Sequence, residues 1–116
     1  MGAEAVDRRI NYIEFNVTSI PRAKDFYGKA FGWTFTDYGP EYASFSDGRT
    51  SGGFRQEKSV AAGGPLLVLY AADLEAIEET IRRAGGKIVK PTFPFPGGRR
   101  FHFSDPSGNE LAVWSE

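Results

Sequence analysis

Residues 99–114, RRFHFSDPSGNELAVW, decide the fold of this chain. Phe101 and Phe103 alternate with polar residues, as in a strand with one apolar face, and the run DPSG at 105–108 predicts a turn before a second strand over 109–114. The first half of the chain contains a similar sequence, because FSD at 45–47 matches FSD at 103–105 and Asp47-Gly48 is a hairpin turn signal. The match indicates an internal repeat.

Each half of the chain shows the same order of elements: a strand, a helix and three more strands. In the first half the strand covers residues 10–17, the helix begins near Pro21 and ends at Gly32, and strands follow at 33–36, 42–46 and 50–56. In the second half the strand covers 66–71, the helix follows Asp73 and ends at Gly85-Gly86, and strands follow at 87–90, 99–104 and 109–114. Residues 91–98 are rich in Pro and Gly, so we expect a loop there.

The repeat and the length of 116 residues predict one α+β domain over residues 1–116, built from two tandem βαβββ modules. Module one covers about 9–57 and module two about 65–115, and the small, flexible residues 58–64 join them. With 41% apolar and 15% aromatic residues the chain can form one core, which excludes a disordered protein.

Charge and composition argue against several classes of protein. The 14 basic and 15 acidic residues give a net charge of −1, so we expect no binding to nucleic acid. No apolar stretch reaches the roughly 20 residues that span a bilayer, and the first residues lack a signal peptide pattern, so we expect a cytoplasmic protein without membrane contact. The absence of cysteine and the single histidine, His102, exclude disulfides, thiolate chemistry and His-rich metal sites.

Three short motifs carry a resemblance to a known family: Phe26-Tyr27, Phe31-Gly32-Trp33 and the closing run FHFSDPSGNE at 101–110. Together with the βαβββ repeat they resemble the vicinal oxygen chelate superfamily over about residues 9–115. That superfamily includes glyoxalases, bleomycin resistance proteins, fosfomycin resistance enzymes and extradiol dioxygenases. The resemblance implies a curled mixed sheet with the helices on its convex face and a ligand pocket on its concave face, while the chemistry differs between members.

The resemblance also implies where a metal ion is held in the members that use one. The corresponding positions in this chain are Tyr12, Phe54, Leu66 and Ala112. Leu, Ala and Phe side chains offer no lone pair to a metal, and one phenol does not make a site. We therefore expect a metal-independent protein with no cofactor.

Strand alternation and the resemblance together select the side chains of the concave face. We expect this face to carry Tyr12, Glu14, Asn16, Phe54, Tyr70, Arg100, His102, Glu110 and Trp114, with most of them bordering one pocket. The aromatic members would form a slot for a flat or apolar ligand, although packing alone also explains them. Arg100 would bind an anionic or carbonyl group of the ligand.

Glu14, His102 and Glu110 are the candidate catalytic residues. Imidazole titrates near neutral pH, and a carboxylate in a partly apolar pocket can act as acid or base. The simpler alternative is that His102 is a hydrogen-bonded structural residue and that Glu14 and Glu110 reach solvent or pair with an arginine, which could be Arg55, Arg99 or Arg100.

Three functions stay open from the sequence. The missing metal ligands and the aromatic lining favour a protein that binds a small organic molecule. A metal-independent lyase or isomerase would explain the titratable groups, and a structural module would have its pocket filled by Tyr12 and Trp114. We expect a homodimer in each case, because the sheets of a single chain would leave exposed edges.

Overall fold

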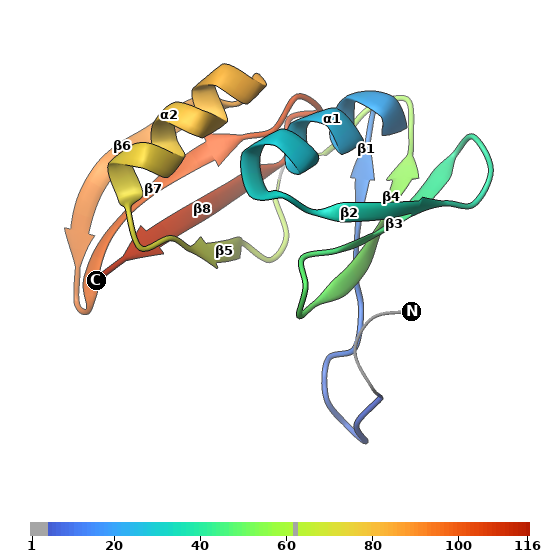
Figure 1. Ribbon diagram of the computed structural model, residues 1–116, viewed down its shortest axis with the longest axis horizontal. Helices are drawn as coiled ribbons and strands as arrows, with labels where there is room; N and C mark the ends of the chain where they lie inside the picture. The colour runs from blue at the N-terminus through green and yellow to red at the C-terminus, as the bar shows by residue number, and fades with distance from the viewer. Residues whose placement is uncertain (1–4, 62) are drawn as a thin grey trace.

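The computed structural model describes residues 5–61 and 63–116 and contains eight strands and two helices (Figure 1). In chain order the elements are β1 (Ile13–Val17), α1 (Ile20–Phe31), β2 (Thr34–Asp37), β3 (Tyr42–Ser46), β4 (Ser51–Gln56), β5 (Leu67–Tyr70), α2 (Leu74–Ala84), β6 (Lys87–Phe95), β7 (Gly98–Ser104) and β8 (Glu110–Ser115). This order confirms the α+β fold with two βαβββ modules. No helix in the described residues is long and apolar enough to cross a membrane.

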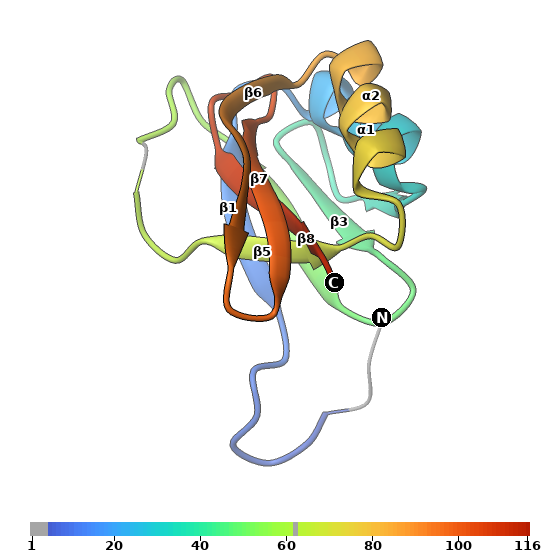
Figure 2. The same cartoon turned by 90° about the vertical axis from the view of Figure 1, so that its left-hand side faces the viewer.

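Each module forms its own four-stranded mixed sheet. The strand orders are β1-β4-β3-β2 and β5-β8-β7-β6, so the first strand of each module pairs in parallel with the last. Within the described chain no strand pair joins the two sheets, which therefore remain open at β1 and β5. Both helices lie next to each other on the same side of the sheets, as Figures 1 and 2 show from two directions.

The ends of both helices follow from local sequence. The Ser19 hydroxyl accepts a hydrogen bond from the Arg22 amide at 3.3 Å, and the Asp73 carboxylate accepts one from the Ala76 amide at 3.0 Å. Gly32 and Gly85 end the helices with φ values of +73° and +107°, a backbone conformation that favours glycine. The predicted helix boundaries are therefore confirmed to within a residue.

The prediction of a loop over residues 91–98 is wrong, because β6 continues through Pro91 and Pro94 to Phe95. Proline lacks a backbone N–H and is tolerated only where no partner strand needs it. β6 is the edge strand of its sheet, and its pairing with β7 shifts register twice, between Ile88 and Lys90 and between Lys90 and Phe93. An irregular edge strand can accommodate both prolines, so the segment forms a long hairpin with β7.

An aromatic core lies between sheet one and its helix. Phe54 is fully buried there, with its ring 5.2 Å from the Phe15 ring and 5.0 Å from the Phe45 ring. The prediction that Phe54 faces the concave side is wrong. In the parallel register of β1 and β4, Phe54 lies beside Phe15, and directly paired residues point to the same face. Gly53, beside Glu14, occupies the opposite face.

The two modules share this core. The rings of Phe26 and Phe31, both on α1, lie 6.1 and 5.9 Å from the ring of Phe103 on β7. Phe26 and Phe103 are both fully buried. Burial of large aromatic side chains is a major source of stability, so neither module has a complete core alone.

The Asp105 carboxylate joins the closing turn to module one. It is almost fully buried, and its Oδ2 accepts a hydrogen bond from the Tyr27 hydroxyl at 2.8 Å. Its Oδ1 accepts from the backbone amides of Ser107 and Asn109, each at 2.9 Å. Burial and the neighbouring Asp105 raise the pKa of Tyr27 well above its usual range, so Tyr27 stays a donor.

The same turn reaches β1 directly. The Asn109 side-chain amide donates to the Asn16 backbone oxygen at 2.7 Å, and the Thr18 amide donates to the Ser107 hydroxyl at 2.8 Å. These bonds connect residues that are about ninety positions apart in the chain. They fix the start of β8 against the end of β1.

We expect Asp105→Ala to lower the free energy of unfolding by about 3 kcal/mol or more, because it leaves the buried Tyr27 hydroxyl and two turn amides without an acceptor. Asp47→Ala is the matched control, since Asp47 also accepts hydrogen bonds from two backbone amides, but in a solvent-exposed turn. This variant should lower the free energy of unfolding by only about 1 kcal/mol. Urea unfolding followed by tryptophan fluorescence measures both. Equal losses would contradict the role given to Asp105.

Candidate functional site

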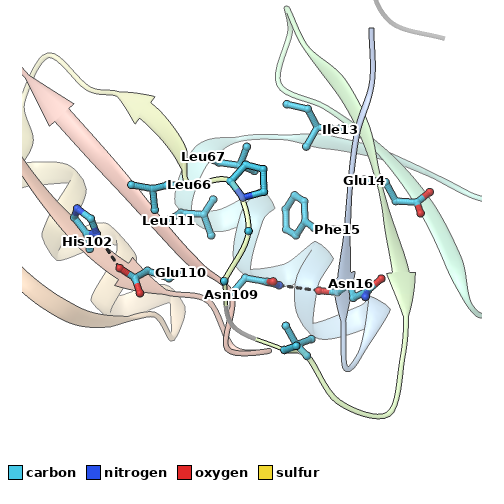
Figure 3. Close-up of a pocket in the computed structure, with 15 residues that line it drawn as sticks. Ile13, Glu14, Phe15, Asn16, Leu66, Leu67, His102, Asn109, Glu110 and Leu111 are labelled. Atoms are coloured by element: carbon cyan, nitrogen blue, oxygen red, sulfur yellow. Dashed lines mark hydrogen bonds and ion pairs between the residues drawn. The ribbon is translucent and has the colours of Figure 1, made fainter. Parts of the chain in front are cut away.

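A cavity of about 540 Å³ lies between the two sheets, where β1 of sheet one comes near β5 and β8 of sheet two (Figure 3). We call it the inter-sheet cavity. Its lining residues are Ile13, Glu14, Phe15, Asn16, Val60, Ala61, Gly63, Gly64, Pro65, Leu66, Leu67, His102, Asn109, Glu110 and Leu111. The cavity is therefore bounded by β1, by the segment before β5, and by β7 and β8.

Most of the cavity wall is apolar. Figure 3 shows Ile13 and Phe15 directed toward Leu67 and Leu111 across the cavity, with Glu14 directed away from them. This alternation along β1 follows from the two-residue period of a strand. The sequence correctly separated the two faces of β1, but the cavity lies beside the apolar face rather than the polar one.

Four of the residues predicted for the site line the inter-sheet cavity: Glu14, Asn16, His102 and Glu110. Tyr12 lies instead beside a second hollow on sheet one. Tyr70, Arg100 and Trp114 do not line the cavity, and Phe54 is in the core. The sequence analysis missed Asn109, although it belongs to the closing motif, and the apolar Ile13, Phe15, Leu67 and Leu111, which it assigned to the core or did not place.

Arg100 and Trp114, which do not line the cavity, contact aromatic side chains of the β6–β7 hairpin. The Arg100 guanidinium carbon lies 5.3 Å from the centre of the Phe93 ring and 5.5 Å from that of Phe95. The Phe95 ring also contacts Trp114, at 6.1 Å between ring centres. Because residues 91–95 continue β6, their aromatic rings cover this part of sheet two.

His102 and Glu110 form a polar pair at one edge of the cavity. The His102 Nδ1 atom lies 2.8 Å from a Glu110 carboxylate oxygen, and Figure 3 shows the two side chains turned toward each other. His102 is only 7% exposed, and its Nε2 atom is buried without a hydrogen-bond partner. The side chain of Glu110 is half exposed, so its carboxylate is the accessible member of the pair.

Glu14 is held on the other face of β1. Its carboxylate accepts a hydrogen bond from the Tyr42 hydroxyl at 2.8 Å, and the Tyr42 and Tyr12 hydroxyls lie 2.7 Å apart. Burial and the hydrogen bonds to Tyr12 and Glu14 raise the pKa of Tyr42, which therefore remains protonated. In the described chain neither Glu14 nor Glu110 pairs with an arginine; their partners are Tyr42 and His102.

The donor set does not fit a metal ion at the family's ligand positions. Leu66 and Ala112 carry no donor atom, Phe54 is in the core, and the Tyr12 hydroxyl is bound to Tyr42. Across residues 5–61 and 63–116, no group of three or more His, Asp or Glu side chains is placed to hold a metal ion. We therefore derive no chemistry through a metal at these positions.

Sequence comparison decides the family. The model of the glyoxalase/bleomycin resistance protein/dioxygenase superfamily matches residues 9–113, nearly the whole chain. The chain belongs to this superfamily. The resemblance seen in the closing motif is thus confirmed, and the superfamily includes resistance proteins as well as enzymes.

Individual relatives share only a small part of the sequence of this superfamily member. A candidate glyoxylase, CFP32, of Mycobacterium bovis is 26% identical over 115 residues, which cover 90% of this chain but only 44% of CFP32. A glyoxalase-related enzyme of Fulvimarina pelagi is 20% identical with a TM-score of 0.79, covering 94% of this chain and 88% of that one. The fosfomycin resistance protein FosX of Listeria monocytogenes is 15% identical with a TM-score of 0.82, covering 95% and 91%. The two solved structures show that the fold is shared.

Proposed function

We propose that this superfamily member binds a small organic molecule in the inter-sheet cavity without using a metal ion. The observation that carries the proposal is the cavity itself. Its volume of about 540 Å³ is within the usual range for small-molecule sites, roughly 300–1,000 Å³. Its walls combine apolar side chains, such as Phe15, Leu66 and Leu111, with five polar ones: Glu14, Asn16, His102, Asn109 and Glu110.

The polar groups define the ligand further. The Asn109 amide nitrogen is already bound to the Asn16 backbone oxygen and to Asp105, at 2.7 and 3.1 Å, so this donor is occupied. The Glu110 carboxylate uses one oxygen toward His102 and keeps the other for a ligand. The expected ligand therefore has an apolar body and a hydrogen-bond donor. An aromatic slot is not part of this proposal, because Phe15 is the aromatic residue that lines the cavity in the described chain.

The relatives support a small organic ligand. The FosX structure from Listeria monocytogenes holds Mn(II) and dihydroxypropylphosphonic acid, so this fold binds a small organic molecule in that protein. Transfer of that chemistry is not proposed, since the metal-ligand positions of this chain lack donors and Glu110 would repel an anion.

A thermal-shift screen of small organic compounds, followed by calorimetric titration of the hits, tests the proposal. Leu66→Trp should weaken binding of a hit at least about tenfold, because the larger side chain fills part of the cavity. Val68→Trp is the matched control, since Val68 is two residues further on, similarly exposed and outside the cavity lining. Equal affinity of the two variants, or a screen without hits, would contradict the proposal.

The pair of His102 and Glu110 favours a second candidate function, a metal-independent lyase or isomerase. His102 orients the Glu110 carboxylate at 2.8 Å, and this carboxylate could take a proton from a carbon next to a ligand carbonyl group. Glu14 does not share this role, because it is bound to Tyr42 and directed away from the cavity (Figure 3).

Hydrogen–deuterium exchange at acidic C–H groups of the hits, followed by NMR in heavy water, distinguishes the two functions. If the protein transfers protons, it should accelerate exchange, and Glu110→Gln should slow the exchange at saturating ligand by about a hundredfold or more. Glu79→Gln, a change on α2 outside the cavity lining, should keep the wild-type rate. If the exchange is no faster than in buffer, the lyase or isomerase hypothesis is wrong and ligand binding remains as the proposed function.

A homodimer is a further part of the proposal. It is supported by the apolar side chains exposed on β5 and just before it, at the open edge of sheet two: Leu66 is 37% exposed, Val68 45% and Tyr70 52%. A second copy would cover this edge and its side chains.

Light scattering at micromolar concentration should give twice the mass of one chain. Val68→Lys should reduce this mass to that of a monomer, because a charge in an apolar interface is unfavourable. Val89→Lys is the control, since Val89 is 50% exposed on β6 at the opposite edge of the sheet. Wild-type protein that has the mass of a single chain would overturn the dimer.

A further inference from the structure

Acidic side chains outnumber basic ones around the inter-sheet cavity. Glu14 and Glu110 line the cavity, whereas no lysine or arginine of the described residues does. The chain as a whole is nearly neutral, with 14 basic and 15 acidic residues, so this excess of negative charge is local. Whether the two carboxylates keep their charge depends on their partners, His102 and Tyr42.

His102 does not neutralise Glu110. The Glu110 side chain is half exposed, so water solvates its ionised form, which accepts the hydrogen carried by the Nδ1 atom of His102. A positively charged ring would carry another hydrogen on Nε2, an atom that is buried and has no acceptor within the described structure. Leaving a charged donor unpaired inside a protein is unfavourable, so this geometry favours the neutral ring. The pair then keeps the negative charge of Glu110.

Glu14 also has an uncharged partner. Its carboxylate accepts the hydrogen of the Tyr42 hydroxyl at 2.8 Å, and a protonated phenol contributes no charge. Arg55 lies opposite Asn16 in the pairing of β1 with β4, but its guanidinium is bound to Glu57 at 3.0 Å. Because Glu14 is directed away from the cavity (Figure 3), it acts on a ligand through its charge and not by contact.

Asn109 can offer a ligand only an acceptor. Both hydrogens of its amide are used, toward the Asn16 backbone oxygen at 2.7 Å and the Asp105 carboxylate at 3.1 Å. What it can offer is its side-chain oxygen, beside the second carboxylate oxygen of Glu110. Two acceptors, one of them negatively charged, match a group that has several hydrogens and a positive charge.

We propose that the inter-sheet cavity takes an organic cation: an apolar body that carries a protonated amine. This inference rests on the proposed function, because it names the class of ligand for the same cavity. An ammonium group has three hydrogens to donate and no acceptor, so it complements these oxygens, and its hydrogen bond to the Glu110 carboxylate is charge-assisted. The apolar body packs against Phe15, Leu66 and Leu111.

Three compounds with the same apolar body test the role of charge: 4-phenylbutylamine, which is a cation at neutral pH, the neutral 4-phenylbutan-1-ol and the anion 4-phenylbutyrate. NMR titration of isotope-labelled protein measures their affinities from saturable shifts of the Leu66 and Leu111 methyl signals. We expect the amine to bind at least about tenfold more tightly than the alcohol, since charge-assisted hydrogen bonds are the stronger ones. The anion should bind more weakly than the alcohol.

Glu110→Gln separates the charge of the site from its shape. Glutamine keeps an acceptor oxygen and nearly the same size, so the affinity for the alcohol should change by less than about twofold. The affinity for the amine should fall about tenfold, to that of the alcohol. Glu79→Gln removes the same charge from the exposed face of α2, outside the cavity lining, and should leave both affinities unchanged.

Equal binding of the amine and the alcohol to the wild-type protein would overturn the cation and leave the cavity as a small-molecule site. A preference for the amine that persists in Glu110→Gln would overturn it in the same way. If none of the three compounds shifts the Leu66 and Leu111 signals, the inference is wrong and the proposed function fails with it. Titration of the alcohol thus distinguishes the two failures.

Discussion

The buried carboxylate of Asp105 is the interaction on which the rest of the structure depends. It holds the closing turn together through two backbone amides and binds that turn to α1 through Tyr27. Asn109, in the same turn, then binds the backbone of Asn16 on β1. As no strand pair among the described residues connects the two sheets, these bonds and the shared aromatic core fix where β8 lies relative to β1. The inter-sheet cavity exists because of that placement.

Strand β1 separates two different chemical environments. On one face Ile13 and Phe15 contribute to the apolar wall of the inter-sheet cavity. On the other, Tyr12 and Glu14 belong to a hydrogen-bonded group with Tyr42. One short strand can serve both because successive side chains point to opposite faces.

The chain keeps the fold of its superfamily, but its polar side chains form hydrogen bonds with each other. Leu66 and Ala112 occupy positions that carry donors in metal-binding members, and the remaining titratable groups are paired within a few ångströms, His102 with Glu110 and Glu14 with Tyr42. This arrangement favours recognition of an organic molecule by shape and a few hydrogen bonds. It leaves Glu110, the half-exposed member of its pair, as the group through which proton transfer would have to occur.

Local sequence is enough to predict the order of the elements, the helix ends at Gly32 and Gly85, and the alternation along β1, because these depend on residues close together in the chain. The tertiary structure was needed to find which face Phe54 occupies and that residues 91–95 form a strand, since both depend on pairing with distant strands. It also decided where the site lies. The cavity forms between two separate sheets, and no local pattern records how two sheets pack against each other.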